Sequence, residues 1–147
     1  MTSREIINLL PYSVPFLFVE ELLEITEDGV KGSYTYKEDE FFYKGHFTGF
    51  PVTPGVILIE TMAQISVVSL GIYLSKENLT DAGFPGIALT SVEVNFLAPV
   101  FPGETVTVGS KKKYFRFGKL SCDVEMRNRE DKIVCAGNIC GIIKTKK

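Results

Sequence analysis

The hydrophobic pattern divides the chain into one long apolar helix and a series of alternating segments. From Pro54 to about Lys76, apolar residues fall on every side of a helix instead of along a single stripe. A helix that is apolar all round is buried on its whole circumference. A proline in the first turn suits the start of such a helix. This pattern predicts a central helix enclosed by the rest of the chain.

The remaining elements follow from period-two alternation and from turn residues. A short helix is expected over Ser3–Leu10, ended by Pro11. Strands are expected over Phe16–Thr26, Val30–Lys37, Ile87–Phe96, Glu104–Phe117, Leu120–Arg127 and Ile133–Ile143. Lys37–Glu40 is interpreted as a solvated turn and Glu77–Gly86 as a loop. One long apolar helix with several antiparallel strands predicts an α+β fold whose sheet wraps around the helix.

Length and composition fit one compact domain over residues 1–147. The net charge of −2 and the pI of about 5.5 exclude bulk attraction to nucleic acid. The odd cysteine count (Cys122, Cys135, Cys140), without a C-x-x-C pair, predicts reduced thiols in a cytoplasmic protein. No Cys/His group has metal-ligand spacing, so no metal is expected. The N-terminus does not have the pattern of a secretory signal.

One segment tests the expectation of a soluble protein. Val56–Leu74 is about long enough to span a bilayer. It is interrupted by Glu60, Thr61, Gln64, Ser66 and Ser69, and a central acid is costly in lipid. A buried helix without membrane insertion is therefore predicted.

Candidate chemistry is concentrated in Gly45–Gln64. His46 is the only histidine, and a lone histidine is more often structural than catalytic. Glu60 carries more information, because a glutamate is almost never fully buried unless it is paired. It must have a partner, lie at an interface or be a neutral acid, and the sequence leaves these alternatives open. Gln64 lies four residues later on the same helical face and can bond the Glu60 carboxyl.

The start of the central helix is a second candidate element. Pro54 suits a helix start, and Gly55 lets a ligand approach the backbone closely. The first N–H groups of a helix lack partners and lie at the positive end of its dipole. The amides near Gly55 and Val56 would therefore suit an oxygen that gains negative charge. With His46 and Glu60 they would form a base, an acid and an oxyanion site.

This segment resembles the signature of the FabZ/FabA-type (3R)-3-hydroxyacyl-[acyl-carrier-protein] dehydratases. The matching positions are Gly45-His46-Phe47, Gly49, Pro51-Val52, Pro54-Gly55-Val56, Glu60 and Met62-Ala63-Gln64. A glutamate at position 60, where the FabA branch has aspartate, favours the FabZ branch. Similarity continues outwards over Leu9–Pro11, Pro15–Leu17, Asn95-Phe96, Pro99-Val100 and Pro102-Gly103. The resemblance thus covers nearly the whole chain.

The resemblance implies a hot-dog fold and the removal of water to form a trans-2-enoyl thioester, in type II fatty acid synthesis or a related lipid or polyene pathway. The substrate would be carried on the phosphopantetheine arm of acyl carrier protein, with no other cofactor. His46 would be the base and Glu60 the acid, and the Gly55 and Val56 amides would bind the thioester carbonyl.

The same resemblance implies two supporting contacts and an oligomer. The Val52 carbonyl would orient the His46 ring, and Gln64 would hold Glu60. His46 of one chain would meet Glu60 of another across a homodimer, and such dimers often assemble in threes.

Three departures from the family pattern leave chain length, gating and carrier docking open: Tyr12-Ser13, Ile87-Ala88 and Leu97-Ala98. Lys111–Lys113 with Arg116 would suit an acidic carrier protein, although a solvated strand face is an equal reading.

Two other functions fit the sequence. A hot-dog acyl thioesterase would use Glu60 to activate water. A non-catalytic acyl-binding subunit would bind a substrate without turnover, but it has no need of both His46 and Glu60.

Overall fold

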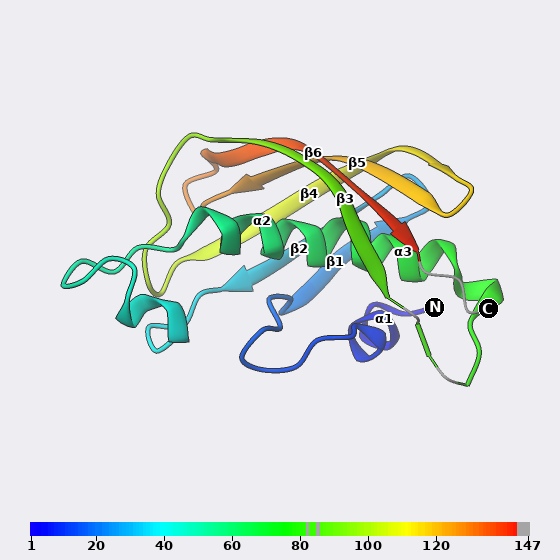
Figure 1. Cartoon of the computed structure of the whole chain (residues 1–147), viewed down its shortest axis with the longest axis horizontal. Helices are drawn as coiled ribbons and strands as arrows, with labels where there is room; N and C mark the ends of the chain where they lie inside the picture. The colour runs from blue at the N-terminus through cyan, green and yellow to red at the C-terminus, as the bar shows by residue number, and fades with distance from the viewer. Residues whose placement is uncertain (82, 85, 144–147) are drawn as a thin grey trace.

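The computed structural model describes residues 1–81, 83–84 and 86–143. Its sheet has six strands in the order β1-β2-β4-β5-β6-β3, and every neighbouring pair is antiparallel. The strands are β1 (Glu21–Thr26), β2 (Gly29–Thr35), β3 (Ile87–Phe96), β4 (Thr105–Arg116), β5 (Lys119–Arg127) and β6 (Ile133–Ile143). Figure 1 shows them crossing one long helix.

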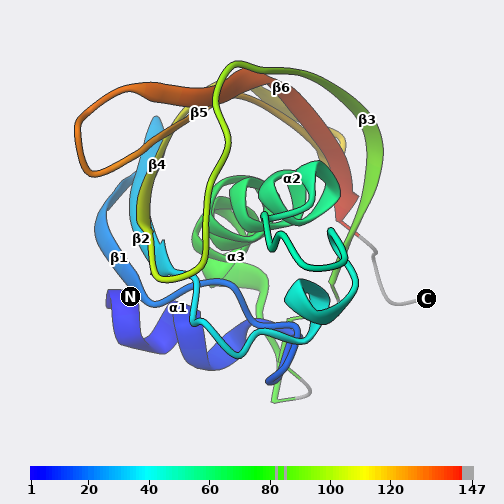
Figure 2. The ribbon, with the colours of Figure 1, turned by 90° about the vertical axis from the view of Figure 1, so that its left-hand side faces the viewer.

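The central helix has three consecutive parts. It starts as α2 (Gly55–Ala63), continues through the π-helical turn η2 (Gln64–Val68) and ends as α3 (Ser69–Leu74). Residues 61–70 are all buried, and the sheet curls around the helix on three sides (Figure 2). This confirms the predicted α+β fold with a sheet wrapped around a central helix. The helix ends at Leu74, slightly earlier than the sequence pattern indicates.

The fourth side of the helix is covered by α1 (Ser3–Leu9) and the segment that follows it (Figure 2). Gly55–Leu74 has a mean hydropathy of 1.8 and, by length and composition alone, is long and apolar enough to cross a membrane. However, 78% of its hydrophobic window is buried inside the protein, which is the behaviour of a core helix.

The strand predicted over Phe16–Thr26 is wrong in its first half, because β1 begins only at Glu21. The Phe18 N–H donates to Gln64 Oε1 at 2.8 Å, and Gln64 Nε2 donates to the Phe16 carbonyl at 3.0 Å. A side-chain amide on the helix thus satisfies backbone groups that a strand would pair with another strand. Apolar alternation does not distinguish these two partners.

The solvated turn predicted over Lys37–Glu40 is wrong at Glu40, which is buried. Its carboxylate accepts hydrogen bonds from the Tyr34 hydroxyl and from the Lys37 N–H. The chain turns inward here because the short 3-10 helix η1 (Phe41–Lys44) packs Phe42 and Tyr43 into the core. Glu40 therefore fixes the start of η1 to strand β2.

The inward faces predicted for two strands are confirmed. Gly32, Tyr34 and Tyr36 are buried on one side of the second strand, and Cys122, Val124 and Met126 on one side of the fifth. The predicted loop after the helix contains the 3-10 turn η3 (Lys76–Asn78) and a bridge between Thr80 and Gly83. Positions 82 and 85 of that loop lie outside the described residues.

Candidate active site

The loop that carries His46 is fixed at both ends. Its first end leaves η1, where the His46 N–H donates to the Phe42 carbonyl at 3.1 Å. Its second end is held where the Thr53 N–H donates to the Val100 carbonyl at 2.9 Å. The Tyr43 and Thr53 hydroxyls share a hydrogen bond of 2.6 Å that closes the base of the loop.

Within the loop, backbone groups form hydrogen bonds with one another. The Val52 N–H donates to the His46 carbonyl at 2.9 Å, and Phe47 and Phe50 exchange two backbone hydrogen bonds of 2.9 Å. Gly49 has φ +75°, a conformation that glycine adopts without a steric penalty. The loop extends past the start of α2 at the left of Figure 1. Its Phe47 and Phe50 side chains are mostly exposed, so the loop presents an apolar tip to its surroundings.

The His46 ring has a defined orientation and tautomer. Its Nδ1 lies 2.9 Å from the Val52 carbonyl oxygen, the contact implied by the resemblance. A carbonyl can only accept, so Nδ1 carries the proton and the neutral ring has its lone pair on Nε2. The Phe47 ring stacks on the imidazole with centroids 4.2 Å apart. This arrangement leaves Nε2 as a proton acceptor.

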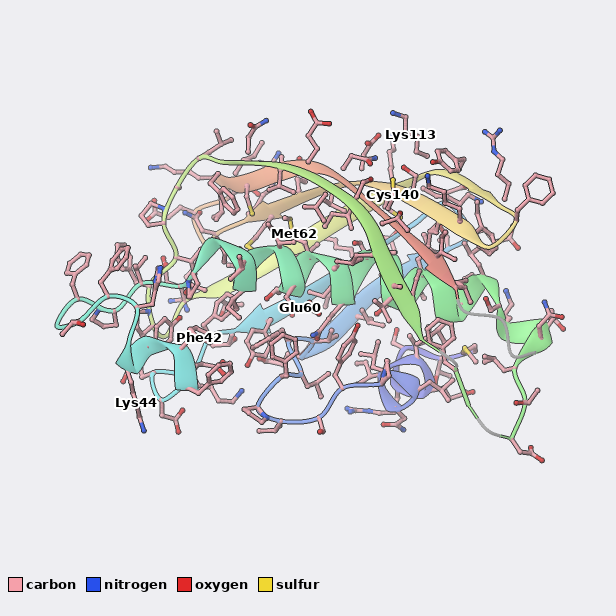
Figure 3. All side chains as sticks on the ribbon, viewed as in Figure 1. Phe42, Lys44, Glu60, Met62, Lys113 and Cys140 are labelled. Atoms are coloured by element: carbon pink, nitrogen blue, oxygen red, sulfur yellow. The ribbon has the colours of Figure 1, made fainter. Side chains whose placement is uncertain are left out.

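The Glu60 carboxyl lies half-buried on α2 (Figure 3). Burial raises its pKa above the ordinary value, and the hydrogen bond from Gln64 opposes part of that rise. That bond joins Gln64 Nε2 to Glu60 Oε2 at 2.9 Å, as the resemblance implies. Burial also raises the pKa of Tyr12 to about 12, and the Glu60 charge adds to that rise. Tyr12 therefore lies in the electrostatic field of Glu60.

The N-terminus of α2 has free donors. Among the described residues, the first backbone donors into this helix are Ile57 and Leu58, both to the Pro54 carbonyl. The amides of Gly55 and Val56 precede them and lack an intrahelical partner, as expected for a first turn. A Cβ atom on Gly55 would lie 3.0 Å from the Phe96 ring. A side chain at this position would therefore press on the Phe96 ring of β3, which would have to shift.

The structure brings some of the predicted site residues together and leaves others apart. His46 pairs with Val52, and Glu60 pairs with Gln64. In the described part of the chain, the side-chain hydrogen bonds of His46 and Glu60 go to these partners and not to each other. No group of three or more His, Cys, Asp or Glu side chains among the described residues is arranged to hold a metal ion.

Sequence reasoning missed three contributors to this region. Glu40 was interpreted as solvated although it anchors the segment before His46, and Phe96 was not expected to lie on Gly55. From the sequence, Tyr12 is only a departure from the family pattern. Its proximity to Glu60 depends on the path of the N-terminal segment, which no local pattern reveals.

Comparisons with known proteins identify the family of this chain. The FabA-like domain family matches residues 10–136. A 3-hydroxyacyl-[acyl-carrier-protein] dehydratase FabZ of Thermus thermophilus is 38% identical over 122 residues, 80% of each chain. The FabZ of Clostridium perfringens is 34% identical over 145 residues, covering 95% of this chain and 96% of the relative.

Solved structures support the fold. A chain of the dehydratase heterocomplex ApeI:P from Xenorhabdus doucetiae superposes with a TM-score of 0.80 at 16% identity, covering 99% of this chain and 93% of that one. A hypothetical thioesterase with coenzyme A from Streptococcus pneumoniae gives 0.65 at 14% identity, covering 86% and 87%. At these identities the likeness concerns the fold alone. The sequence relatives and the domain match together show that this chain belongs to the FabA-like family, among the FabZ-type 3-hydroxyacyl-[acyl-carrier-protein] dehydratases.

Proposed function

We propose that this protein is a (3R)-3-hydroxyacyl-[acyl-carrier-protein] dehydratase that releases water and forms a trans-2-enoyl thioester. The supporting observation is a matched pair of groups: a histidine with its lone pair on Nε2 and a carboxyl whose pKa burial raises. The first suits proton removal and the second suits proton donation near neutral pH. Family membership points to the same reaction.

The base step uses His46. A C2 proton next to a thioester is weakly acidic, so its removal requires a base within hydrogen-bonding reach. The Nδ1–H bond to the Val52 carbonyl fixes the ring and stabilises the imidazolium that forms when Nε2 takes the proton.

The acid step uses Glu60. Hydroxide is a poor leaving group, so the C3 hydroxyl must be protonated as its bond to carbon breaks. Because burial raises its pKa, the Glu60 carboxyl holds its proton to a higher pH than an exposed glutamate does and can deliver that proton to the hydroxyl. When water leaves, the C2 proton is on His46 and Glu60 is a carboxylate, so a proton must pass from the imidazolium to Glu60, directly or through solvent, before the next turnover.

Negative charge that develops on the thioester oxygen is stabilised at the helix N-terminus. The amides of Gly55 and Val56 supply the donors, and the helix dipole adds positive potential there.

The catalytic site is shared between two copies of the chain in this proposal. Supporting it, His46 and Glu60 have no hydrogen bond to each other within one chain, and the His46 loop extends outward. Strand β3 supplies a surface for association. It lies at the sheet edge, most of its residues are exposed, and they include Leu89 and Val92 at 40%. An unpaired apolar edge is a template for another chain.

A homodimer built on β3 is accordingly proposed, with assembly of three dimers as its extension. Acyl carrier protein is the proposed partner and brings the phosphopantetheine arm, so the enzyme needs no further cofactor. The basic side chains of Lys111, Lys113 and Arg116 are candidates for contact with its acidic surface. We place the enzyme in the cytoplasm, where such carriers would supply its substrate.

The thioesterase and the acyl-binding subunit are separated from the dehydratase by one assay. Purified protein is given crotonyl thioesters of coenzyme A and of acyl carrier protein, and both enoyl absorbance and free thiol are followed. A dehydratase hydrates the double bond, the reverse reaction, without releasing thiol. Thiol release with an intact double bond would assign a thioesterase, and no change with either substrate would favour a binding role.

The shared site has its own experiment. Inactive His46→Ala and inactive Glu60→Gln chains are mixed under conditions that exchange subunits. If each site uses both chains, half of the dimers are mixed and have one intact site, so about a quarter of wild-type activity returns. If the two residues belong to the same chain, the mixture stays inactive. Each variant incubated alone is the control.

A further inference from the structure

The backbone of the segment before β1 is hydrogen-bonded to the side chain of Gln64 on the central helix. The Gln64 side chain is fully buried. It forms three hydrogen bonds with described residues. Oε1 accepts from the Phe18 N–H at 2.8 Å, and Nε2 donates to the Phe16 carbonyl at 3.0 Å and to Glu60 Oε2 at 2.9 Å. Two of the partners are backbone groups more than forty residues away in sequence.

These two backbone contacts fix the orientation of the amide independently. A backbone N–H can only donate and a backbone carbonyl can only accept. Turning the Gln64 amide over would set N–H against N–H at Phe18 and oxygen against oxygen at Phe16. Phe18 and Gln64 are both buried, so losing these bonds would be costly. The amide therefore points its NH₂ group, and never its oxygen, at Glu60.

A fixed amide donor constrains the proton of Glu60. Both hydrogens of Nε2 are in use, one on the Phe16 carbonyl and one on Glu60 Oε2. Oε2 must accept, and the carbonyl-type oxygen of a protonated carboxyl is the better acceptor. The acidic proton is then on Oε1, the oxygen that the amide does not contact.

We propose that the backbone of Phe16 and Phe18 acts through Gln64 to decide which Glu60 oxygen carries the proton, keeping Oε2 as acceptor and Oε1 as donor. The role of Oε1 as donor to substrate rests on the proposed dehydratase function. The orientation of the carboxyl proton does not. Gln64 is thus a positioning residue, and the irregular segment before β1 is part of the acid's support.

The ionisation of Glu60 can be separated from that of the titratable groups near it. In the chain itself Tyr12 is the neighbour, and burial and the Glu60 charge raise its pKa to about 12, beyond the working range. In the proposed shared site, His46 of the second copy faces the same carboxyl. The basic limb of a pH profile that disappears in Glu60→Gln is therefore assigned to Glu60.

Two variants test the proposal in the full-length protein. Gln64→Met removes every polar contact at similar length, whereas Gln64→Glu keeps an acceptor for the Phe18 N–H but has no amide donor. Both are expected to lower kcat about tenfold, part of a general acid's contribution, and to move the Glu60 limb to higher pH. The sign follows because the lost bond stabilised the charged carboxylate. Hydrogen exchange at Phe18 is expected to accelerate in Gln64→Met and stay slow in Gln64→Glu.

Ser66→Ala is the matched control, because Ser66 is another buried polar residue of this helix and its hydroxyl donates to the Met62 carbonyl. It is expected to change stability without moving the limb. The carboxyl infrared band removed by Glu60→Gln gives a readout independent of activity. If that band titrates identically in wild type and both Gln64 variants, the proposal is overturned. If it moves while no hydration activity exists, the positioning device stands and the dehydratase assignment fails.

Discussion

The two members of the proposed catalytic pair lie in contrasting regions. His46 is on a loop that satisfies its own backbone and exposes Phe47 and Phe50. Glu60 is on a helix whose next ten residues are all buried. The proposed base is thus carried on a projecting segment, while the proposed acid is half-buried on the helix that forms the core.

The difference follows from what each group needs. In the proposed shared site the base must reach a second chain, and its ring requires one fixed partner, the Val52 carbonyl. The proposed acid must hold its proton to a higher pH than an exposed glutamate does, which a poorly solvated position on the central helix favours. Backbone hydrogen bonds hold the exposed loop in place. On the helix, burial raises the pKa of Glu60.

The largest effect is expected when each half loses its proton chemistry but keeps its shape. His46→Asn retains an amide donor for the Val52 carbonyl, and Glu60→Gln retains an acceptor for the Gln64 amide. Each should lower hydration of a crotonyl thioester by about 10²- to 10⁴-fold, the usual contribution of general acid–base catalysis. Thermal stability should change little. Substantial activity in His46→Asn would remove the base assignment.

The loop's anchor should be the next most sensitive point. Glu40→Ala leaves the Tyr34 hydroxyl and the Lys37 N–H without their buried acceptor, which should cost about 2 kcal/mol of unfolding free energy. Asp39→Ala, at the exposed neighbouring position, should stay within about 0.5 kcal/mol. Urea denaturation measures both. Equal, small effects would mean that Glu40 does not anchor η1.

At the helix, the first turn should respond through activity more than through stability. In Gly55→Ala the new Cβ would lie 3.0 Å from the Phe96 ring, which is half exposed and can shift. The amides would move with it, and kcat should fall about tenfold because small misplacements of catalytic groups are costly. Adding Phe96→Leu should recover part of the loss. An unchanged kcat in Gly55→Ala would argue against an oxyanion role for this turn.

The smallest effect concerns pH. The folded-state pKa of Glu60 is raised by burial, so the folded protein holds this proton more tightly than the unfolded chain. Its contribution is fully present below the ordinary glutamate pKa and is lost as pH rises through the folded pKa. The stability of wild type relative to Glu60→Gln should therefore decline over that window and then level off, as measured by denaturation from acidic to neutral pH. A rise with pH would show that the carboxylate is stabilised.

Local patterns predicted much of the fold. The central helix, the later strands and their inward faces follow from periodicity, because a residue's side of a helix or strand depends on its position along the element. The irregular path of Phe16–Phe18 could not be predicted, since backbone groups there are held by a glutamine side chain distant in sequence. The burial of Glu40 could not be predicted for a related reason. A charged side chain in a turn is normally solvated, but here the Tyr34 hydroxyl of strand β2 donates to its carboxylate.

The amino-acid sequence shows which chemical groups are present and in what order. They are a single histidine, an acid in an apolar helix, and a Pro-Gly helix start. Tertiary structure alone decided their states. The proton position on His46 depends on the Val52 carbonyl, and the orientation of Gln64 depends on Phe16 and Phe18. Residue type sets which protons a group can exchange, whereas burial and hydrogen-bond partners, which arise only on folding, set where those protons reside.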